Sequence, residues 1–128
     1  MKRNLLLTLL LTLFVISSCS KMTQEERFKK VAELENLKCP KQLSYNTRYD
    51  STHYDTQNNC VSYYYTLSGK ADNPEKYNKN YNTFRKALEE NVINSIEMKA
   101  YIDYKTTIKY IYYSDSTKKV LAEFIFNE

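Results

Sequence analysis

A change in the spacing of apolar residues, midway along the chain, places the strongest constraint on its fold. From Cys60 to Leu67 apolar side chains alternate with smaller or polar ones, a period of two that is typical of a half-buried β-strand. From Tyr77 to Ile96 apolar residues recur at helical spacing, and Pro74 stands where a first helical turn would begin. A chain that carries both periods in one small domain belongs to a mixed class, with strands and helices packed in layers.

The remaining segments complete a regular order of elements. Thr23 and Glu26 form a capping-box pattern ahead of an apolar stripe, which predicts a helix that ends at Cys39-Pro40. Strands are expected in two hairpins, the first over 47–55 and 60–67 and the second over 106–113 and 120–126. The predicted fold is therefore α+β: a two-layer sandwich in which two helices cover one face of a four-stranded antiparallel sheet, in the order α-β-β-α-β-β.

The first residues indicate export. Lys2 and Arg3 precede an uncharged apolar run from Leu5 to Ile16, and two small residues follow it. This run is shorter than the roughly 20 residues that a membrane-spanning helix needs. A secretory signal is thus a better interpretation than a transmembrane anchor.

The segment Ile16-Ser17-Ser18-Cys19 resembles the lipobox of bacterial lipoproteins. The resemblance implies that residues 1–18 are removed and that Cys19 carries the lipid, so that residues 19–22 are a short tether and 23–128 a single domain. Two or more acyl chains hold a protein stably at a membrane. Ser20 after the cysteine favours the outer membrane in an organism that has one. The alternative is an ordinary signal peptide followed by a free cysteine.

The composition of the mature chain excludes several classes of function. Without Lys2 and Arg3, 17 basic residues face 15 acidic ones, and the charges are interleaved. Nucleic-acid binding would need a concentrated basic stripe, so none is expected. With His53 as the single histidine and no Cys-x-x-Cys motif, we expect neither a metal nor a cofactor. Cys39 and Cys60 could form a disulfide in an oxidising compartment, or they could be separate thiols.

Polar residues near the middle of the chain resemble the components of a hydrolase site, but their arrangement argues against catalysis. Asp50, Ser51, His53 and Asp55 lie on one predicted strand, whereas a catalytic triad joins distant segments beside an oxyanion hole. No nucleophile elbow is present. We therefore expect no enzymatic activity. Arg48 shares a strand face with Asp50, which suggests a local ion pair, or alternatively an arginine that binds a ligand.

All 13 tyrosines lie beyond the predicted signal. Tyr64 faces away from Tyr63 and Tyr65, and Tyr113 faces away from Tyr110 and Tyr112. If the helices cover one sheet face, Val61, Tyr63, Tyr65 and Leu67 would point toward them. Tyrosine is favoured at recognition surfaces. We accordingly expect a binding surface on the opposite face that includes Tyr64, with Tyr113 and Arg48 as further candidates. The sequence does not decide whether Tyr110 and Tyr112 or Ile111 and Tyr113 face inward, and these tyrosines could simply fill a strand-rich surface.

A second resemblance spans residues 36–126. Cys39-Pro40, Thr47-Arg48-Tyr49-Asp50-Ser51 and Tyr63-Tyr64-Tyr65-Thr66-Leu67, with a tyrosine-rich final hairpin, are similar to a family of small bacterial envelope proteins. The chain departs from that pattern at Asp103–Thr106. The resemblance implies no activity and no catalytic residues.

Taken together, the sequence predicts a lipid-anchored, non-enzymatic envelope protein. It would be bound to the membrane through its lipid and would recognise a protein or a glycan. The alternative is an immunity or inhibitor lipoprotein that neutralises a toxin acting in the envelope.

Overall fold

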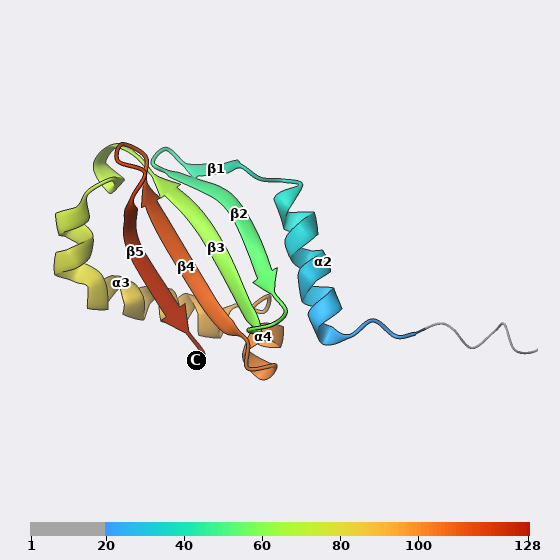
Figure 1. Ribbon diagram of the computed structural model, residues 1–128. Coiled ribbons are helices and arrows are strands. Elements are labelled where there is room, and N and C mark those ends of the chain that lie inside the picture. Colours follow the sequence, from blue (N-terminus) through green and yellow to red (C-terminus); the bar gives the residue numbers. More distant parts are fainter. Residues whose placement is uncertain (1–19) are drawn as a thin grey trace, which may run out of the picture.

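The computed structural model describes residues 20–128, so the predicted signal and Cys19 lie outside the described residues (Figure 1). The domain orders its elements α-β-β-β-α-β-β, with one further short helix before the last two strands. The main helices and the short one are α2 (Gln24–Asn36), α3 (Pro74–Asn94) and α4 (Lys99–Asp103). The strands are β1 (Lys41–Ser44), β2 (Thr47–Asp55), β3 (Cys60–Leu67), β4 (Thr107–Ser114) and β5 (Val120–Phe126). The predicted α+β class is confirmed.

The sheet has five strands in the order β1-β2-β3-β4-β5, and it is mixed rather than antiparallel. β3 and β4 pair in parallel, with Cys60 opposite Thr107 and Leu67 opposite Ser114. The prediction of an all-antiparallel sheet was wrong because the chain crosses over through α3 and α4 between these two strands. Such a crossover returns the chain to the end where β3 began, so the next strand runs parallel to it.

β1 was not predicted at all, and its residues explain why. The four residues Lys41–Ser44 are all exposed and show no alternation of apolar and polar side chains. β1 pairs with only the first part of β2, Lys41 opposite Tyr49 and Gln42 opposite Arg48. A strand this short is specified by its pairing rather than by its own pattern. The sheet therefore has five strands and not the predicted four.

The two long helices begin where the sequence predicts. The Thr23 hydroxyl accepts a hydrogen bond from the Glu26 amide at 3.2 Å, and the Glu26 carboxylate accepts one from the Thr23 amide at 2.8 Å. At the start of α3 the Asn73 side chain accepts from the amide of Lys76 at 3.1 Å. No helix within residues 20–128 is both long and apolar enough to cross a membrane.

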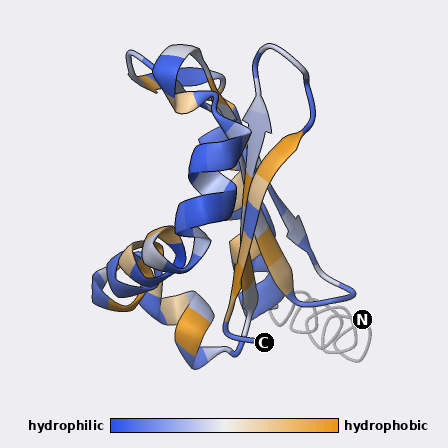
Figure 2. Ribbon diagram, turned by 90° about the vertical axis from the view of Figure 1, so that its left-hand side faces the viewer, coloured by the Kyte–Doolittle hydropathy of each residue, from blue (hydrophilic) through white to orange (hydrophobic). Residues whose placement is uncertain are grey.

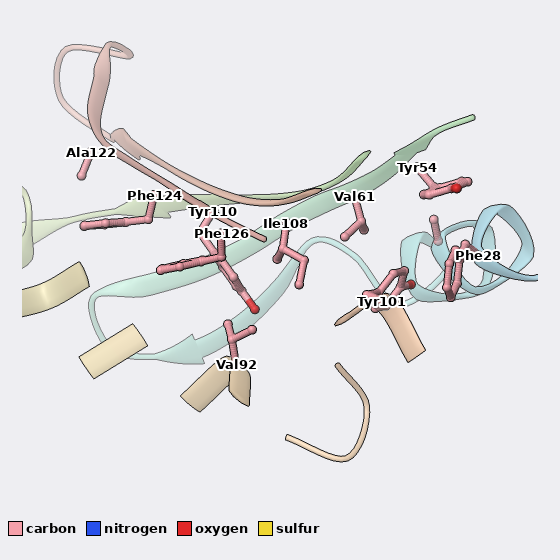
Figure 3. Close-up of a cluster of buried hydrophobic side chains, with 11 residues drawn as sticks. Phe28, Tyr54, Val61, Val92, Tyr101, Ile108, Tyr110, Ala122, Phe124 and Phe126 are labelled. Atoms are coloured by element: carbon pink, nitrogen blue, oxygen red, sulfur yellow. The ribbon is translucent and has the colours of Figure 1, made fainter. Parts of the chain in front are cut away.

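α3 and α4 lie on one side of the sheet (Figure 2), and α2 lies along its β2 edge (Figure 1). Phe28 of α2 and Val92 of α3 join the same hydrophobic core as strand residues from β2 to β5 (Figure 3). Val61, Tyr63 and Tyr65 of β3 belong to this helix-facing side, as predicted. The fully buried centre of the core lies on β3, β4 and β5, at Val61, Ile108 and Phe124.

The apolar stripe of α3 covers less of the sheet than its sequence suggests. Val92 is its only buried residue, and Tyr77, Phe84 and Leu88 are partly buried against the core. Ile93 is 65% exposed, and Ile96, beyond the end of the helix, is 92% exposed. The helix layer therefore leaves part of the inner face of the sheet uncovered.

Candidate functional site

The uncovered part of the inner sheet face forms a cleft of about 370 Å³. One wall is the end of α2 together with β1, and the other is the segment Glu97–Met98 that connects α3 to α4. The floor consists of four tyrosines from β2, β3 and β4: Tyr49, Tyr63, Tyr65 and Tyr110. We call these four residues the tyrosine floor. A volume in this range is typical of small-ligand sites.

The rings of the tyrosine floor stack on one another across the strands. The centroids of Tyr63 and Tyr110 are 5.2 Å apart, and those of Tyr49 and Tyr65 are also 5.2 Å apart, with interplanar angles of 20° and 28°. Tyr65 also stacks on Tyr112 at 5.0 Å, which extends the row toward α3. Because the ring faces are covered by their neighbours, the tyrosines present mainly their edges to the cleft.

The hydroxyl groups of the tyrosine floor are largely enclosed by the domain. The Tyr49 hydroxyl is closed off from solvent and has no hydrogen-bond partner among the described residues, and Tyr49 as a whole is 9% exposed. The hydroxyls of Tyr63 and Tyr110 both donate to the sulfur of Met98, at 3.9 and 4.0 Å, and a thioether is a weak acceptor. The unmet hydrogen bond of Tyr49 therefore lies beneath the cleft and not on its surface.

Burial changes the acidity of these phenols. Loss of solvent raises the pKa of Tyr110 to about 12, and burial likewise raises the pKa values of Tyr49, Tyr63 and Tyr65 above their ordinary value. These phenols thus remain protonated throughout the physiological range, and each can both donate and accept a hydrogen bond.

Charged residues of both signs surround the opening of the cleft. Glu35 and Lys38 come from the end of α2 and form an ion pair at 3.6 Å, with both side chains largely exposed. Lys41 stands beside Tyr49 because the two residues are paired in the β1–β2 ladder. Glu97 lies on the opposite wall. The rim therefore carries two carboxylates and two ammonium groups and has no net charge.

Specific contacts fix both walls. The Asn36 side chain bonds to both backbone groups of Thr52, accepting from its amide and donating to its carbonyl, each at 2.8 Å. These bonds occupy the edge of β2 beyond the end of β1 and hold the last turn of α2 beside the sheet. On the other wall, the contacts of Met98 with Tyr63 and Tyr110 hold the start of α4 over the tyrosine floor.

The surface that the sequence singled out lies on the opposite face of the sheet. Tyr64 and Tyr113 are both half-buried, and their rings stack with centroids 6.5 Å apart. They come together because β3 and β4 are adjacent, with Tyr64 opposite Ile111 and Thr66 opposite Tyr113. The structure thus brings the two predicted tyrosines into contact, and a binding role for them stays a prediction.

Arg48 lies on this outer face in a closed polar network. Its Nε donates to Asp50 at 2.5 Å, and its Nη2 donates to the hydroxyl of Thr66 at 3.3 Å. The same hydroxyl donates to the other carboxylate oxygen of Asp50 at 2.6 Å. The expected local ion pair is present, and its groups satisfy one another.

The remaining polar residues of β2 do not form a catalytic arrangement. His53 is exposed and Ser51 is half-buried, and neither donates to the other. Asp55 instead organises the turn into β3, accepting from the amides of Gln57 and Asn58 at 3.0 and 3.3 Å. Within residues 20–128 no cluster of histidine, cysteine and acidic side chains could hold a metal ion.

Cys39 and Cys60 are both free thiols. Cys39 leads into β1 and Cys60 begins β3, and these two strands lie on opposite sides of β2. At about 4.8 Å between neighbouring strands, their backbones are roughly 10 Å apart. A disulfide requires Cα atoms within about 7 Å. Of the two alternatives that the sequence leaves open, the structure therefore has the separate thiols.

Sequence reasoning placed Tyr63 and Tyr65 under the helices, left Tyr49 and Tyr110 unplaced, and so missed the cleft. The alternation of β3 correctly predicts that Tyr63 and Tyr65 face the helices. The available signal was the number of tyrosines on that face, because a buried hydroxyl needs a partner that an apolar core does not provide.

Comparison with known proteins places the chain in a family without an assigned activity. A family model described as a domain of unknown function, DUF8479, matches residues 22–122. Among solved structures, a crystal structure described as a "putative secreted protein" (PA3611) from Pseudomonas aeruginosa is similar, with a TM-score of 0.70 and 14% identity. The match covers 80% of this chain and 88% of that one, and at this identity it shows a shared fold alone. No curated protein matches the chain.

Proposed function

The chain belongs to the family of this domain of unknown function, DUF8479, and we propose that it is a non-enzymatic binding protein of the cell envelope that takes its ligand in the tyrosine-floored cleft. The observation that carries the proposal is the cleft itself, an opening of about 370 Å³ on the helix-facing side of the sheet with four tyrosines at its floor and charged side chains at its rim. Pockets of this size with a few convergent polar groups are the usual form of a ligand site.

The anchoring part of the proposal rests on the first residues. The lipobox-like Ile16-Ser17-Ser18-Cys19 supports lipidation of Cys19 and removal of residues 1–18. Residues 20–22 then separate the lipid from the cap of α2, so that the domain stays within about 10 Å of extended chain from its anchor. The description of the Pseudomonas relative as secreted agrees with export. With Ser20 after the cysteine, we propose the outer membrane as its location.

A non-enzymatic role is supported by the chemistry of the cleft. Its lining consists of neutral phenols, a thioether, and carboxylates and ammonium groups at the rim. A nucleophile activated by an adjacent base, which covalent catalysis requires, is not among these lining residues. Groups of this kind can bind and orient a ligand.

Binding through the cleft is tested by comparing matched variants of the full chain. Wild-type protein, Leu43→Arg and Tyr64→Phe would each be used to retain components of native envelopes, because Leu43 lines the cleft and is 51% exposed. A long charged side chain at this position should obstruct the cleft, so we expect a component that wild type and Tyr64→Phe retain and Leu43→Arg does not. Retention by Leu43→Arg with loss in Tyr64→Phe would move the working surface to the outer face and contradict the proposal.

Anchoring has its own test. Cys19→Ala should leave the protein unprocessed or in the soluble fraction, whereas the wild type should fractionate with membranes. Mass spectrometry of the wild type would contradict lipidation if it found an unmodified mature terminus at another residue.

A further inference from the structure

We propose that one side of α2 rests on the membrane surface, with its aliphatic side chains against the lipid and its basic side chains on anionic lipid phosphates. This inference rests on the proposed lipid anchor at Cys19 and adds a fixed orientation of the domain to it. The surface in question, which we call the α2 stripe, consists of six residues at helical spacing from α2 and the turn that follows it: Arg27, Lys30, Val31, Leu34, Leu37 and Lys38.

The α2 stripe is exposed along its whole length, although half of it is aliphatic. Val31, Leu34 and Leu37 are 47%, 52% and 81% exposed. Residues three positions apart are neighbours on a helix surface, so these side chains form a continuous row. The core takes another side of the helix, which carries the buried residues Phe28 and Ala32. Single apolar residues on a surface need no explanation, whereas a continuous exposed row indicates a surface that contacts a partner or a membrane.

Every charge on the α2 stripe is positive. Arg27 and Lys30 have no ion-pair partner among residues 20–128, and Lys38 pairs only with Glu35 at 3.6 Å, with both side chains largely exposed. Anionic lipids attract basic side chains close to a membrane. A helix that combines an apolar row with lysine and arginine is typical of those that lie in the plane of the membrane surface.

The glutamates of α2 lie off the stripe. The carboxylate of Glu25 accepts a hydrogen bond from the hydroxyl of Tyr104, and that of Glu26 closes the capping box. Glu35 lines the cleft. Glu33 precedes Leu34 by one position and so points about 100° away from it around the helix. Acidic groups, which anionic lipids would repel, are therefore kept to the other sides of α2.

The position of the anchor selects lipid as the partner of the stripe. Residues 20–22 alone separate Cys19 from the cap of α2, a distance of at most about 10 Å. Figure 1 shows α2 at the margin of the domain, with these residues leading away from its start. So short a tether holds the stripe at a high effective concentration beside the membrane, where even weak association is sufficient to orient the domain. Lys21 and Met22 on the tether are exposed and carry the same combination of positive charge and apolar surface.

The orientation has a consequence for the cleft. Lys38 belongs both to the α2 stripe and to the rim of the cleft. A domain that rests on the stripe therefore holds this part of the rim close to the lipid headgroups. A ligand of the cleft would then be taken up next to the membrane.

The inference is tested with a fluorescent reporter in the full lipidated chain, reconstituted into vesicles. The chain contains no tryptophan, so Leu34→Trp introduces a single one on the stripe. The matched control is Lys29→Trp, an exposed position about 140° around the helix from Leu34. The vesicles would be an equal mixture of phosphatidylglycerol and a phosphatidylcholine that carries bromine, a fluorescence quencher, in its acyl chains. A helix at the membrane surface places its apolar side about 5–10 Å into the lipid, so the Leu34→Trp emission should fall by at least about half, whereas the Lys29→Trp emission should change little.

A charge-reversed variant tests the basic side chains. Arg27→Glu with Lys30→Glu, added to Leu34→Trp, should remove most of the quenching while the lipid still holds the chain on the vesicles. Sodium chloride at about 1 M, which screens charges beyond about 3 Å, should likewise reduce the quenching of Leu34→Trp. Because all three positions are exposed, thermal melts of the variants should match that of the wild type.

Flotation with the vesicles tests the anchor, and quenching tests the orientation. If the wild type floats but Leu34→Trp is quenched no more than Lys29→Trp, the anchor stands and the inference is overturned. If charge reversal leaves the quenching of Leu34→Trp unchanged, the basic side chains do not bind anionic lipid, which also overturns it. If the wild type does not float, the proposed anchor is wrong and the inference falls with it.

Discussion

The two faces of the sheet both carry tyrosines, but the polar groups beside them differ in how well the fold satisfies them. On the outer face, Tyr64 and Tyr113 lie near the network of Arg48, Asp50 and Thr66, whose charged and hydroxyl groups bond to one another at 2.5–3.3 Å. On the inner face, the hydroxyl of Tyr49 is enclosed beneath the cleft without a partner. The comparison teaches that strand alternation decides which face a tyrosine joins but not whether its hydroxyl finds a partner there.

The largest expected difference between the two faces appears at high pH. Burial raises the pKa values of the tyrosine floor and of Tyr112, to about 12 for Tyr110 and Tyr112, above the ordinary value of 10.0. Because the phenol pKa values are higher in the folded state than in the unfolded state, their contribution to stability is fully present below pH 10. This contribution is lost as the pH rises through the pKa values of the folded state. Each such tyrosine should lower the free energy of unfolding by about 1.4 kcal/mol per pH unit above 10.

Urea denaturation at a series of alkaline pH values measures this slope. In the double variant Tyr110→Phe with Tyr112→Phe, the free energy of unfolding should fall less steeply with pH. Its slope should be shallower than that of the wild type by roughly 3 kcal/mol per pH unit. The outer-face variant Thr66→Val, which removes no titrating group, should shift the curve without changing its slope. A double variant with the wild-type slope would show that these inner phenols do not differ from exposed ones.

The next difference concerns packing. Tyr110 is 8% exposed and contacts Tyr63, Tyr65 and Phe126, whereas Tyr113 is half-buried and stacks on Tyr64 alone. Tyr110→Ala should cost about 3–5 kcal/mol, the usual loss for a large buried aromatic residue. Tyr113→Ala should cost roughly 1 kcal/mol, as for one cross-strand pair. Chemical denaturation of both variants makes the comparison, and equal losses would mean that the outer face is as well packed as the inner one.

The features that the sequence predicts correctly are the facing of strand residues and the starts of the helices. The alternation in β3 predicts correctly which side chains face the helices, and Thr23 and Pro74 indicate where α2 and α3 begin. These are local patterns, set by a few neighbouring residues. Side chains that face the helices were expected to be core residues, however. This expectation was wrong for Tyr63 and Tyr65, which line the cleft.

The features that could not be predicted depend on contacts between distant segments. The parallel pairing of β3 with β4 follows from the crossover through α3, and β1 exists only because β2 pairs with it. The cleft depends on where two walls stand, one fixed by Asn36 on Thr52 and the other by Met98 on the tyrosine floor. Neither contact has a signal in the spacing of residues along the chain.

Removing one hydroxyl from each region should change stability in opposite directions. Tyr49→Phe deletes a buried hydroxyl without a partner, so the ligand-free protein should gain about 1 kcal/mol. Thr66→Val deletes a hydroxyl that donates to Asp50 at 2.6 Å and accepts from Arg48, so it should lose about 1–2 kcal/mol.

Thermal melts of both variants against wild type decide the signs. A destabilised Tyr49→Phe would mean that its hydroxyl has a partner in solution and would contradict the expected sign.

The smallest expected effect is that of the ion pair on the outer face. The Arg48 and Asp50 side chains are 44% and 24% exposed, and solvent screens their attraction. A double-mutant cycle with Arg48→Ala and Asp50→Ala should give a coupling energy of roughly 0.5–1 kcal/mol that falls as salt is added. Neither single variant should change binding, since the guanidinium is already bonded to Asp50 and Thr66. If Arg48→Ala abolished retention of an envelope component while costing no more stability than this, Arg48 would have to leave Asp50 to contact the partner. The outer face with Tyr64 and Tyr113 would then be the working surface, and the unpaired hydroxyl of Tyr49 would be only a defect in packing.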